Sequence, residues 1–297
     1  MDRLSGVMPA NPARTFARLP VVQALIDTAL AEDVGAGDVT SDSLVSSRAR
    51  ASARLVARQP LVVAGLEVAA AVFRRVSPGI RVEFGAEDGA SVAVGTTLLS
   101  VRGPAASLLT AERTALNFVQ RMSGVASLTR QFVEAVKPHR ARILDTRKTL
   151  PGWRLLDKYA VACGGGTNHR TGLFDQVLIK DNHLAHWARH AGGGTLADAV
   201  REARRRHPKL VIEVEADTPA QVEELLPARP DWILLDNMSP AELRRCVRLC
   251  AGVCRTEASG GVNLRTVRRI AATGVDAISV GALTHSAPAA DVALDFD

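Results

Sequence analysis

From residue 142 to residue 281, short apolar runs typical of β-strands alternate with segments typical of helices, and this alternation constrains the fold more than any other feature. The helices have clear start signals. Thr218 and Ser239 are each followed by proline and, three positions on, by Gln221 and Glu242, which is the pattern of a capping box. Strands and helices in alternation predict parallel pairing through right-handed crossovers. The strands are predicted at residues 142–146, 176–180, 210–215, 232–236, 254–258 and 276–281.

Six or seven parallel strands fit a closed or nearly closed α/β barrel of the TIM type better than an open dinucleotide-binding sheet. The first strand is not followed by the GxGxxG motif, and no acidic residue stands at the distance that a bound ribose requires. The second half of the chain is therefore predicted to be an α/β barrel.

The first half of the chain has a different pattern. Residues 1–20 contain several prolines and no periodicity, so they are expected to form a tail. Residues 21–31 have helical spacing. From residue 51 to residue 103, short β-rich runs surround one predicted helix at 66–76, which indicates a small α+β unit. Residues 105–136 return to helical spacing of the apolar positions.

Cationic side chains gather between Arg142 and His183, beside the apolar runs 143–144 and 177–179. Strands that end in charged residues usually deliver them to the rim of a sheet or barrel, where α/β enzymes have their sites. The triglycine 164–166 between the runs allows a close approach of backbone, because it has no Cβ atoms. This segment is therefore predicted to bind a substrate with several negative charges through Arg147, Lys148, His169, Arg170 and Lys180.

Three of the predicted strands end in a carboxylate, namely Glu215, Asp236 and Glu257. The carboxyl ends of parallel barrel strands share one rim, so these acids are expected to converge on the mouth that also holds the cations. Acids in this position suit a metal ion or the hydroxyls of a sugar. They are also common as the first residues of helices, and the pattern leaves both interpretations open.

The last two predicted strands end in loops of small residues. Such loops, with backbone N–H groups at the start of a helix, commonly hold a phosphate in barrels, although glycine turns there also serve as simple connections. The loops contain Ser259, Gly260, Gly261, Val280, Gly281 and Ala282.

The formal net charge is +6 and the pI is about 9.6. An anionic small molecule, a nucleic acid or simply an arginine-rich solvated surface would each explain this excess. The single tyrosine, Tyr159, offers little for the stacking surfaces of single-strand nucleic-acid binders. The first residues lack the apolar core of a secretory signal, and no run reaches the roughly 20 apolar residues of a membrane span. A cytoplasmic location is expected.

Two spacings that are typical of metal sites are interpreted as structural. Cys246, Cys250 and Cys254 are four positions apart, as in some iron–sulfur proteins, but free cysteine on a helix usually packs as a small apolar residue. His183, His186 and His190 have helical ligand spacing, and no carboxylate or cysteine completes their set.

As an ordered set, the motifs resemble those of the quinolinate phosphoribosyltransferases, which are carboxylating nicotinate-nucleotide pyrophosphorylases. The matching motifs run in order through residues 21–297: EDVGAGDVTSD, LTAERTALNFVQRMSGVAS, LDTRKTLPG, KYAV, GGG, NHR, LIKDNH, IEVE, ILLDN, SGG and SVGALTH. The chain departs from the pattern only in the Gly192–Gly194 loop and in the long N-terminal tail.

The resemblance implies a pentosyltransferase of NAD biosynthesis that converts quinolinate and phosphoribosyl pyrophosphate (PRPP), with Mg²⁺, into nicotinate mononucleotide, pyrophosphate and CO₂. It also implies an N-terminal α/β sandwich over residues 21–125, with residues 284–297 packing back on it, and a barrel over 126–283. The family forms a homodimer, in which the sandwich of one subunit covers the barrel mouth of the other.

The resemblance also assigns roles to residues. Arg147, His169, Arg170 and Lys180 correspond to the quinolinate-binding cations, with Thr146 and Lys148 beside them. Arg113 corresponds to the arginine that crosses the dimer interface. Glu215 and Asp236 match the acids near the ribose and the metal ion, so Lys148, Glu215 and Asp236 are the predicted catalytic residues. The small-residue loops at 259–261 and 280–282 are expected to take the 5′-phosphate.

Three other functions are weighed against this one. A phosphoribosyltransferase of the same architecture could take nicotinate, because the spacing of the cations does not by itself require a dicarboxylate. A paralogue found beside molybdate transporters shares several of the motifs. A nucleic-acid-binding protein would explain the high pI, but its motifs are absent from the sequence.

Overall fold

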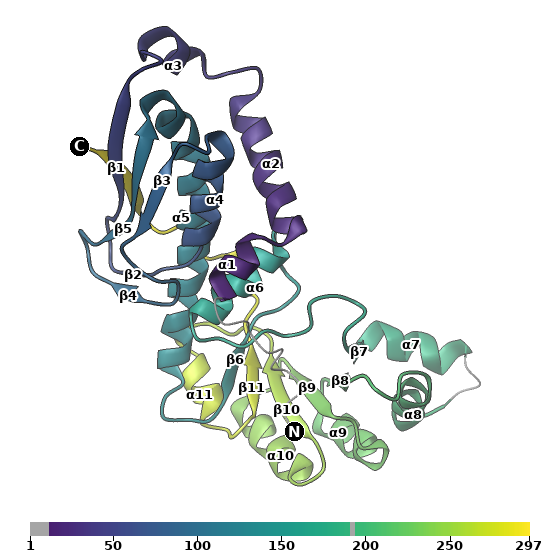
Figure 1. Ribbon diagram of the computed structural model, residues 1–297. Coiled ribbons are helices and arrows are strands. Elements are labelled where there is room, and N and C mark those ends of the chain that lie inside the picture. Colours follow the sequence, from purple (N-terminus) through teal and green to yellow (C-terminus); the bar gives the residue numbers. More distant parts are fainter. Residues whose placement is uncertain (1–11, 191–193) are drawn as a thin grey trace. The chain divides into compact units, whose positions relative to one another are not determined.

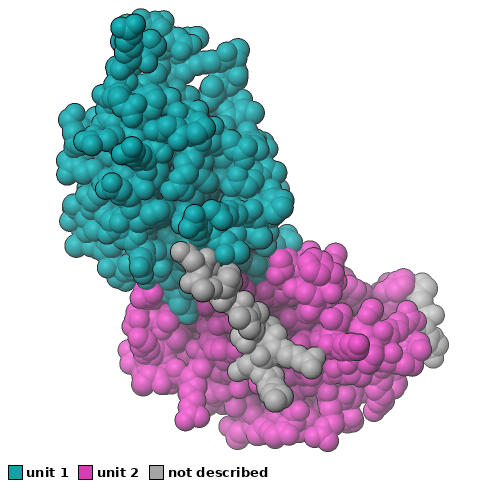
Figure 2. All heavy atoms as spheres, viewed as in Figure 1, with its two compact units in different colours: residues 1–128, 151–165, 287–297 teal, residues 129–150, 166–286 magenta. Residues whose placement is uncertain are grey.

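The computed structural model describes residues 12–190 and 194–297, which form two compact units (Figure 2). Unit 1 comprises Met1–Leu128, Pro151–Gly165 and Ala287–Asp297, and unit 2 comprises Thr129–Leu150 and Gly166–Ser286. The predicted domains place residues 151–165 in the barrel, whereas the structure packs this segment within unit 1. Part of the Gly192–Gly194 loop and the start of the predicted tail lie outside the described residues.

Unit 1 is built on an antiparallel sheet of order β12-β1-β5-β3 (Figure 1). The C-terminal strand pairs with the first strand, with Leu55 opposite Leu294. Side chains of the first strand alternate between the two faces of the sheet: Ala53 and Leu55 are buried, whereas Arg54 between them is exposed. The four strands are β1 (Arg50–Ala57), β3 (Arg81–Phe84), β5 (Thr97–Pro104) and β12 (Val292–Phe296), and a separate pair is formed by β2 (Leu61–Val62) and β4 (Ser91–Val92).

Helices lie on one side of this sheet, and the strongly amphipathic α4 buries Val72 and Phe73 (Figure 1). Asp38 begins α3 by accepting the Ser41 N–H at 3.0 Å. The helices of unit 1 are α1 (Pro12–Ala17), α2 (Pro20–Val34), α3 (Val39–Leu44), α4 (Leu66–Val76), the first part of α5 (Ala105–Ala135) and α6 (Arg154–Cys163). Helix α1 falls within the predicted tail, which corrects that prediction for residues 12–17; the segment is too short to reveal helical periodicity.

Helix α6 belongs to unit 1 because its side chains bond there. Asp157 pairs with Arg121 of α5 at 3.2 Å, and the Tyr159 hydroxyl donates to Asp88 at 2.8 Å. The triglycine 164–166 ends this helix: the Gly164 N–H donates to the Ala160 carbonyl, and Gly165 has a φ of +87°.

Unit 2 contains a six-stranded parallel sheet of order β6-β11-β10-β9-β8-β7. The predicted strands are confirmed, and their order is that of a barrel, because the last strand, β11, pairs with the first, β6. Among the described residues β6 and β7 do not pair with each other, so this seam leaves the barrel open at one place. The strands are β6 (Arg142–Leu144), β7 (Val177–Ile179), β8 (Ile212–Ala216), β9 (Trp232–Asp236), β10 (Arg255–Ser259) and β11 (Ala277–Ser279).

The helices between these strands begin where the sequence predicts. Both predicted capping boxes, at Thr218 and Ser239, are present, and Thr195 forms a third with Asp198. Helix α10 buries Cys246 and Cys250 as apolar residues. The helices of unit 2 are the end of α5, α7 (Asp181–His190), α8 (Leu196–Arg206), α9 (Pro219–Leu225) with the short 3₁₀ turn Leu226–Ala228, α10 (Pro240–Cys250), α11 (Val267–Ala271) and α12 (Ala282–His285).

Candidate active site

A pocket of about 250 Å³ lies at the carboxyl ends of the parallel strands of unit 2. It brings together most of the side chains that the sequence predicts to form the site, including the predicted acid Glu257, and it adds Ser279 and two leucines. Its lining residues are Thr146, Arg147, Lys148, His169, Arg170, Leu178, Lys180, Glu215, Leu234, Asp236, Glu257, Ser259 and Ser279.

The cations of the pocket come from the segment after β6, the segment before β7 and the residue that follows β7. Burial and the nearby Arg147 guanidinium lower the pKa of Arg170, which shows that two positive charges share a partly desolvated region. The Nε atom of Arg147 is buried and has no hydrogen-bond partner among the described residues. An anion with several oxygens would compensate both charges.

Lys148 is held in place through its backbone. Its N–H donates to the Thr146 hydroxyl at 3.0 Å, and its carbonyl accepts a hydrogen bond from the Thr284 hydroxyl at 2.7 Å. A Cβ atom at Gly281 would lie 3.2 Å from Cδ of Lys148, so the loop after β11 packs against this side chain. The predicted phosphate loop and Lys148 are therefore neighbours.

The acidic side of the pocket is formed by Glu215 at the end of β8 and Asp236 at the end of β9. Together with Asp217 their oxygens lie within 4.8 Å of one another, a set of hard ligands that fits Mg²⁺. Burial raises the pKa of Glu215; Lys180 acts in the other direction, and Asp236 adds to the rise. Asp217 is not among the predicted residues, although its position two residues after Glu215 is a signal for it.

The two small-residue loops lie beside the pocket. Gly260 has a φ of +93°, and a Cβ atom there would meet Oδ1 of Asn237 at 2.1 Å, so this position requires glycine. Val280 is buried and its N–H donates to the Leu144 carbonyl at 2.9 Å, so this residue anchors its loop instead of offering an amide to a ligand. Of the predicted phosphate-loop residues, the pocket lining contains Ser259. Gly260, Gly261, Val280 and Gly281 lie in the adjoining loops, and Ala282 is the first residue of α12.

Below the rim lies a buried cluster of His169, Glu213 and Glu257. Nε2 of His169 is 3.0 Å from Oε2 of Glu213 and 3.4 Å from Oε2 of Glu257. The two glutamates are 1% and 2% exposed, and each has one buried oxygen without a hydrogen-bond partner among the described residues. Burial, with Glu257 close by, raises the pKa of Glu213. Sequence reasoning missed Glu213, although the alternation of IEVE places it on the same strand face as Glu215.

The lining of this pocket does not include the other predicted residues. Arg113 belongs to unit 1, where it is exposed on α5. His183 uses its Nδ1 atom to accept the Lys180 N–H at 2.9 Å, and the side chain of His190 lies outside the described residues.

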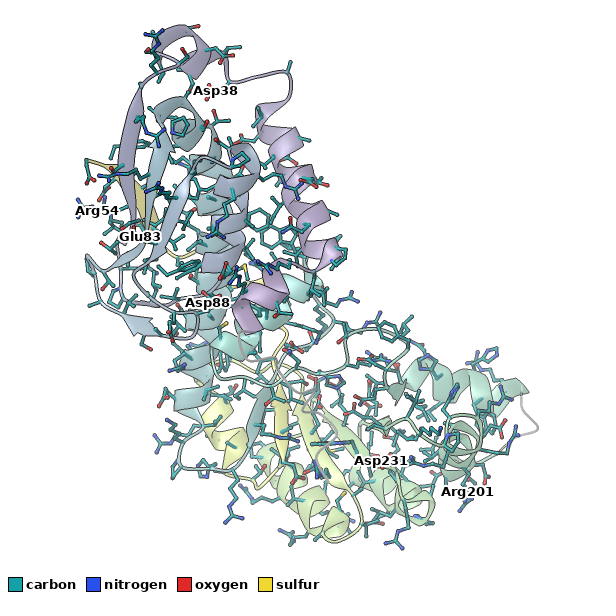
Figure 3. All side chains as sticks on the ribbon, viewed as in Figure 1. Asp38, Arg54, Glu83, Asp88, Arg201 and Asp231 are labelled. Carbon is teal, nitrogen blue, oxygen red and sulfur yellow. The ribbon has the colours of Figure 1, made fainter. Side chains whose placement is uncertain are left out.

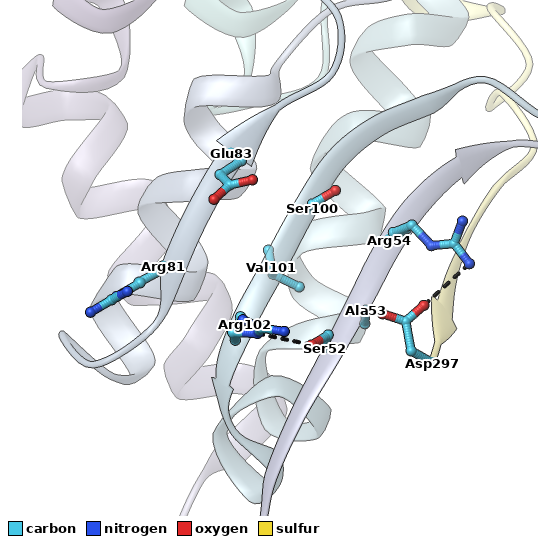
Figure 4. A pocket seen from close by; sticks show the side chains of 9 residues that line it. All are labelled: Ser52, Ala53, Arg54, Arg81, Glu83, Ser100, Val101, Arg102 and Asp297. Atoms are coloured by element: carbon cyan, nitrogen blue, oxygen red, sulfur yellow. Dashed lines mark hydrogen bonds and ion pairs between the residues drawn. The ribbon is translucent and has the colours of Figure 1, made fainter.

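Unit 1 has a second polar groove, on the sheet face opposite its helices (Figure 4). Arg54 pairs there with Asp297 at 3.2 Å, and Nε of Arg102 donates to the Ser52 hydroxyl at 3.2 Å. The labelled Arg54 and Glu83 mark this face in the view of all side chains (Figure 3). Its charged side chains are exposed, which is typical of a solvated sheet face.

No helix in the described part of the chain has both the length and the apolar character that crossing a membrane requires.

Comparison with known proteins agrees with this geometry. Two family models match consecutive parts of the chain: the N-terminal domain of quinolinate phosphoribosyl transferase at residues 38–123 and its C-terminal domain at residues 125–295. The nicotinate-nucleotide pyrophosphorylase [carboxylating] of Mycobacterium leprae is 45% identical over 279 residues, which cover 91% of this chain and 95% of that protein.

Solved structures show the same similarity. The nicotinate-nucleotide pyrophosphorylase of Francisella tularensis aligns with a TM-score of 0.88 at 35% identity, covering 95% of this chain and 99% of that one. The enzyme of the same name from Ehrlichia chaffeensis aligns with a TM-score of 0.86 at 41% identity, covering 92% and 98%. This chain therefore belongs to the quinolinate phosphoribosyltransferase family.

Proposed function

We propose that this protein transfers the phosphoribosyl group of PRPP to quinolinate and releases pyrophosphate and CO₂, giving nicotinate mononucleotide for NAD biosynthesis. One observation carries the proposal: a single pocket of unit 2 is lined by both cations and carboxylates. Relatives at 39–45% identity are named as carboxylating nicotinate-nucleotide pyrophosphorylases or as decarboxylating quinolinate phosphoribosyltransferases, as in tobacco.

The cationic side suits a dicarboxylate. Quinolinate has two adjacent carboxylates, and the planar guanidinium of arginine binds a carboxylate through two parallel hydrogen bonds. Arg147 and Arg170 share the same part of the pocket, and Lys180 lies at its edge beside Glu215. In the proposal these three residues bind quinolinate and orient its ring nitrogen toward the sugar.

The acidic side suits the ribose. As the bond between C1′ and the pyrophosphate breaks, positive charge develops on the sugar and negative charge on the leaving group. Glu215 and Asp236 favour the cationic sugar and orient its hydroxyls, while Lys148 stabilises the departing pyrophosphate. The ring nitrogen supplies the electron pair for the new bond, so it needs positioning more than activation.

Magnesium is part of the proposal. The oxygens of Glu215, Asp217 and Asp236 form a hard ligand set that would hold the ion together with phosphate oxygens of the substrate. When bound, Mg²⁺ neutralises charge on the pyrophosphate. In the proposal, these three residues hold the ribose hydroxyls and the pyrophosphate at the same rim of the barrel.

Decarboxylation follows the transfer. The ring nitrogen of the intermediate is quaternary, so its positive charge stabilises the electron pair that the breaking carbon–carboxylate bond leaves on the adjacent carbon. The carbon that loses CO₂ then takes up a proton. In the proposal, Arg147 and Arg170 hold the ring during this step through the carboxylate that remains.

The assembly and location of the protein stay predictions. In the proposal the protein is a homodimer, and Arg113 of one subunit adds a further cation to the pocket of its partner. Support comes from the exposure of Arg113 on α5, since no contact within unit 1 buries it. The predicted location is the cytoplasm.

The test is an assay of the purified protein with PRPP, Mg²⁺ and either quinolinate or nicotinate. We expect nicotinate mononucleotide and one equivalent of CO₂ from quinolinate alone. Turnover of nicotinate without CO₂ would overturn the proposed substrate and leave the phosphoribosyl site in place.

A further inference from the structure

Both ring nitrogens of His169 are engaged by the protein. On one side, Nε2 faces the carboxylates of Glu213 and Glu257 at 3.0 and 3.4 Å. On the other side, Nδ1 accepts the backbone N–H of Arg170 at 2.7 Å. The ring therefore joins the two strands β8 and β10 to the backbone of the next residue along the chain.

The contacts on its two sides determine where the proton of His169 lies. Burial lowers the pKa of His169, whereas its contacts with Glu213 and Glu257 raise it. The Arg170 N–H, however, requires a lone pair on Nδ1. The short amide contact defines the tautomer directly, so the proton lies on Nε2, facing the carboxylates.

The backbone around His169 is bonded to β6 and to the residue that follows it. The Thr167 N–H donates to the Ile143 carbonyl at 2.8 Å, and the His169 N–H donates to the buried carboxylate of Asp145 at 2.8 Å. These bonds attach the segment to β6, and the imidazole attaches it to the strands across the barrel.

Arg170 depends on this attachment. Its side chain lines the pocket, and its Nη1 atom also donates to the Gln176 carbonyl at 3.3 Å. The side chain of Gln176 in turn donates to Oε2 of Glu213 at 2.6 Å. Glu213 thus contacts both residues that hold Arg170, although it does not itself line the pocket.

We propose that His169 is a positioning residue, held at Nε2 by Glu213 and Glu257, which fixes the Arg170 backbone at Nδ1 so that the guanidinium faces the anionic substrate. This replaces the expected role of His169 as a cation that binds quinolinate directly. The identity of the anion rests on the proposed function, whereas the positioning role of His169 rests on the geometry of unit 2.

The test compares His169→Asn with His169→Leu. Asparagine keeps an acceptor at the place of Nδ1 and carries no charge, whereas leucine keeps only the size. We expect His169→Leu to raise the KM for quinolinate about 10- to 100-fold, as a misplaced binding group does. The KM of His169→Asn for quinolinate should be about tenfold lower than that of His169→Leu, because asparagine keeps one hydrogen bond. The KM for PRPP should stay within about twofold in both.

Glu213→Leu is the second variant, because Glu213 lies outside the pocket lining. We expect its KM for quinolinate to rise about tenfold. Binding of benzene-1,2-dicarboxylate, measured by calorimetry, is the matching readout in all variants, since this probe lacks the ring nitrogen and cannot react. Arg170→Ala, which removes the direct contact, should show the largest loss of binding.

Equal defects in His169→Asn and His169→Leu, with wild-type binding in Glu213→Leu, would show a direct contact and overturn the inference. A rise in both KM values together would show a merely structural role and overturn it as well. Failure of the wild type to turn over quinolinate while it binds the probe would overturn the proposed function alone, since the binding series would still report on His169.

Discussion

The groove of unit 1 and the pocket of unit 2 are both lined by arginines and carboxylates, but the charges are exposed to water in the groove and partly buried in the pocket. In the groove, Arg81 stands directly opposite Arg102, and Ser100 stands between Glu83 and Arg54. Charged side chains there are exposed, so water solvates them. In the pocket, Arg170 is half-buried, and the buried Nε of Arg147 has no partner among the described residues.

The difference follows from topology. The groove is one face of an antiparallel sheet, where side chains of both signs stand side by side. The pocket collects the carboxyl ends of parallel strands, which deliver distant parts of the chain to one rim. Charge that is partly desolvated in a pocket can bind a substrate, whereas charge that is solvated on a sheet face mainly keeps a surface soluble.

The largest expected effect tests this contrast directly. Arg147→Ala should raise the KM for quinolinate about 100-fold, because it removes charged hydrogen bonds in a partly desolvated pocket. Arg102→Ala in the groove is the matched control and should leave the kinetics unchanged. Steady-state assays check both, with circular dichroism to show that the fold is intact. Wild-type turnover in Arg147→Ala would contradict the assignment of the pocket.

A smaller effect is expected at the acidic side of the pocket. Asp236→Asn should raise the Mg²⁺ concentration for half-maximal activity about tenfold, because one charged ligand becomes a neutral one. Removal of the ion with a chelator should abolish turnover of the wild type. Glu83→Gln in the groove is the control, and an equal change in both variants would argue against a metal site at Glu215, Asp217 and Asp236.

The cysteines extend the comparison to thiols. Burial and the nearby Asp88 raise the pKa of Cys163 in unit 1 to about 12, whereas a hydrogen bond from Cys250 lowers the pKa of Cys254 in unit 2. Thiolate forms only as pH approaches the pKa, so at pH 8 Cys254 should react first with iodoacetamide and Cys163 should react slowly until pH nears 12. Mass spectrometry of the labelled peptides measures this order, and prior labelling of Cys163 would contradict it.

The smallest effect is expected in the groove. Arg54→Ala breaks the exposed ion pair with Asp297 and should change the free energy of unfolding by less than about 1 kcal/mol. Chemical denaturation at low and at high salt would measure it, with a smaller difference at high salt because the charges are screened. A loss of several kcal/mol would show that the groove is less solvated than its exposure indicates.

Much of the fold could be predicted from local patterns. Capping boxes at Thr218 and Ser239 and the apolar runs before Glu215 and Asp236 are properties of neighbouring residues, and the structure confirms the helices and strands that they predict. Helix α1 was missed because six residues give too little periodicity. The local pattern places segment 151–165 in the barrel. Its packing on α5 depends on residues that are distant in sequence, so no local pattern reveals it.

The candidate site divides in the same way. By itself, the sequence determined which charged residues end the strands, because charge after an apolar run is visible in any strand. Only the tertiary structure decided that Glu213 and Glu257 meet at one histidine, that Asp217 joins Glu215 and Asp236, and that the Val280 amide is already bonded. The physical reason is that a hydrogen bond depends on the position of two atoms to within a few tenths of an ångström, and those positions are set by packing across the whole barrel.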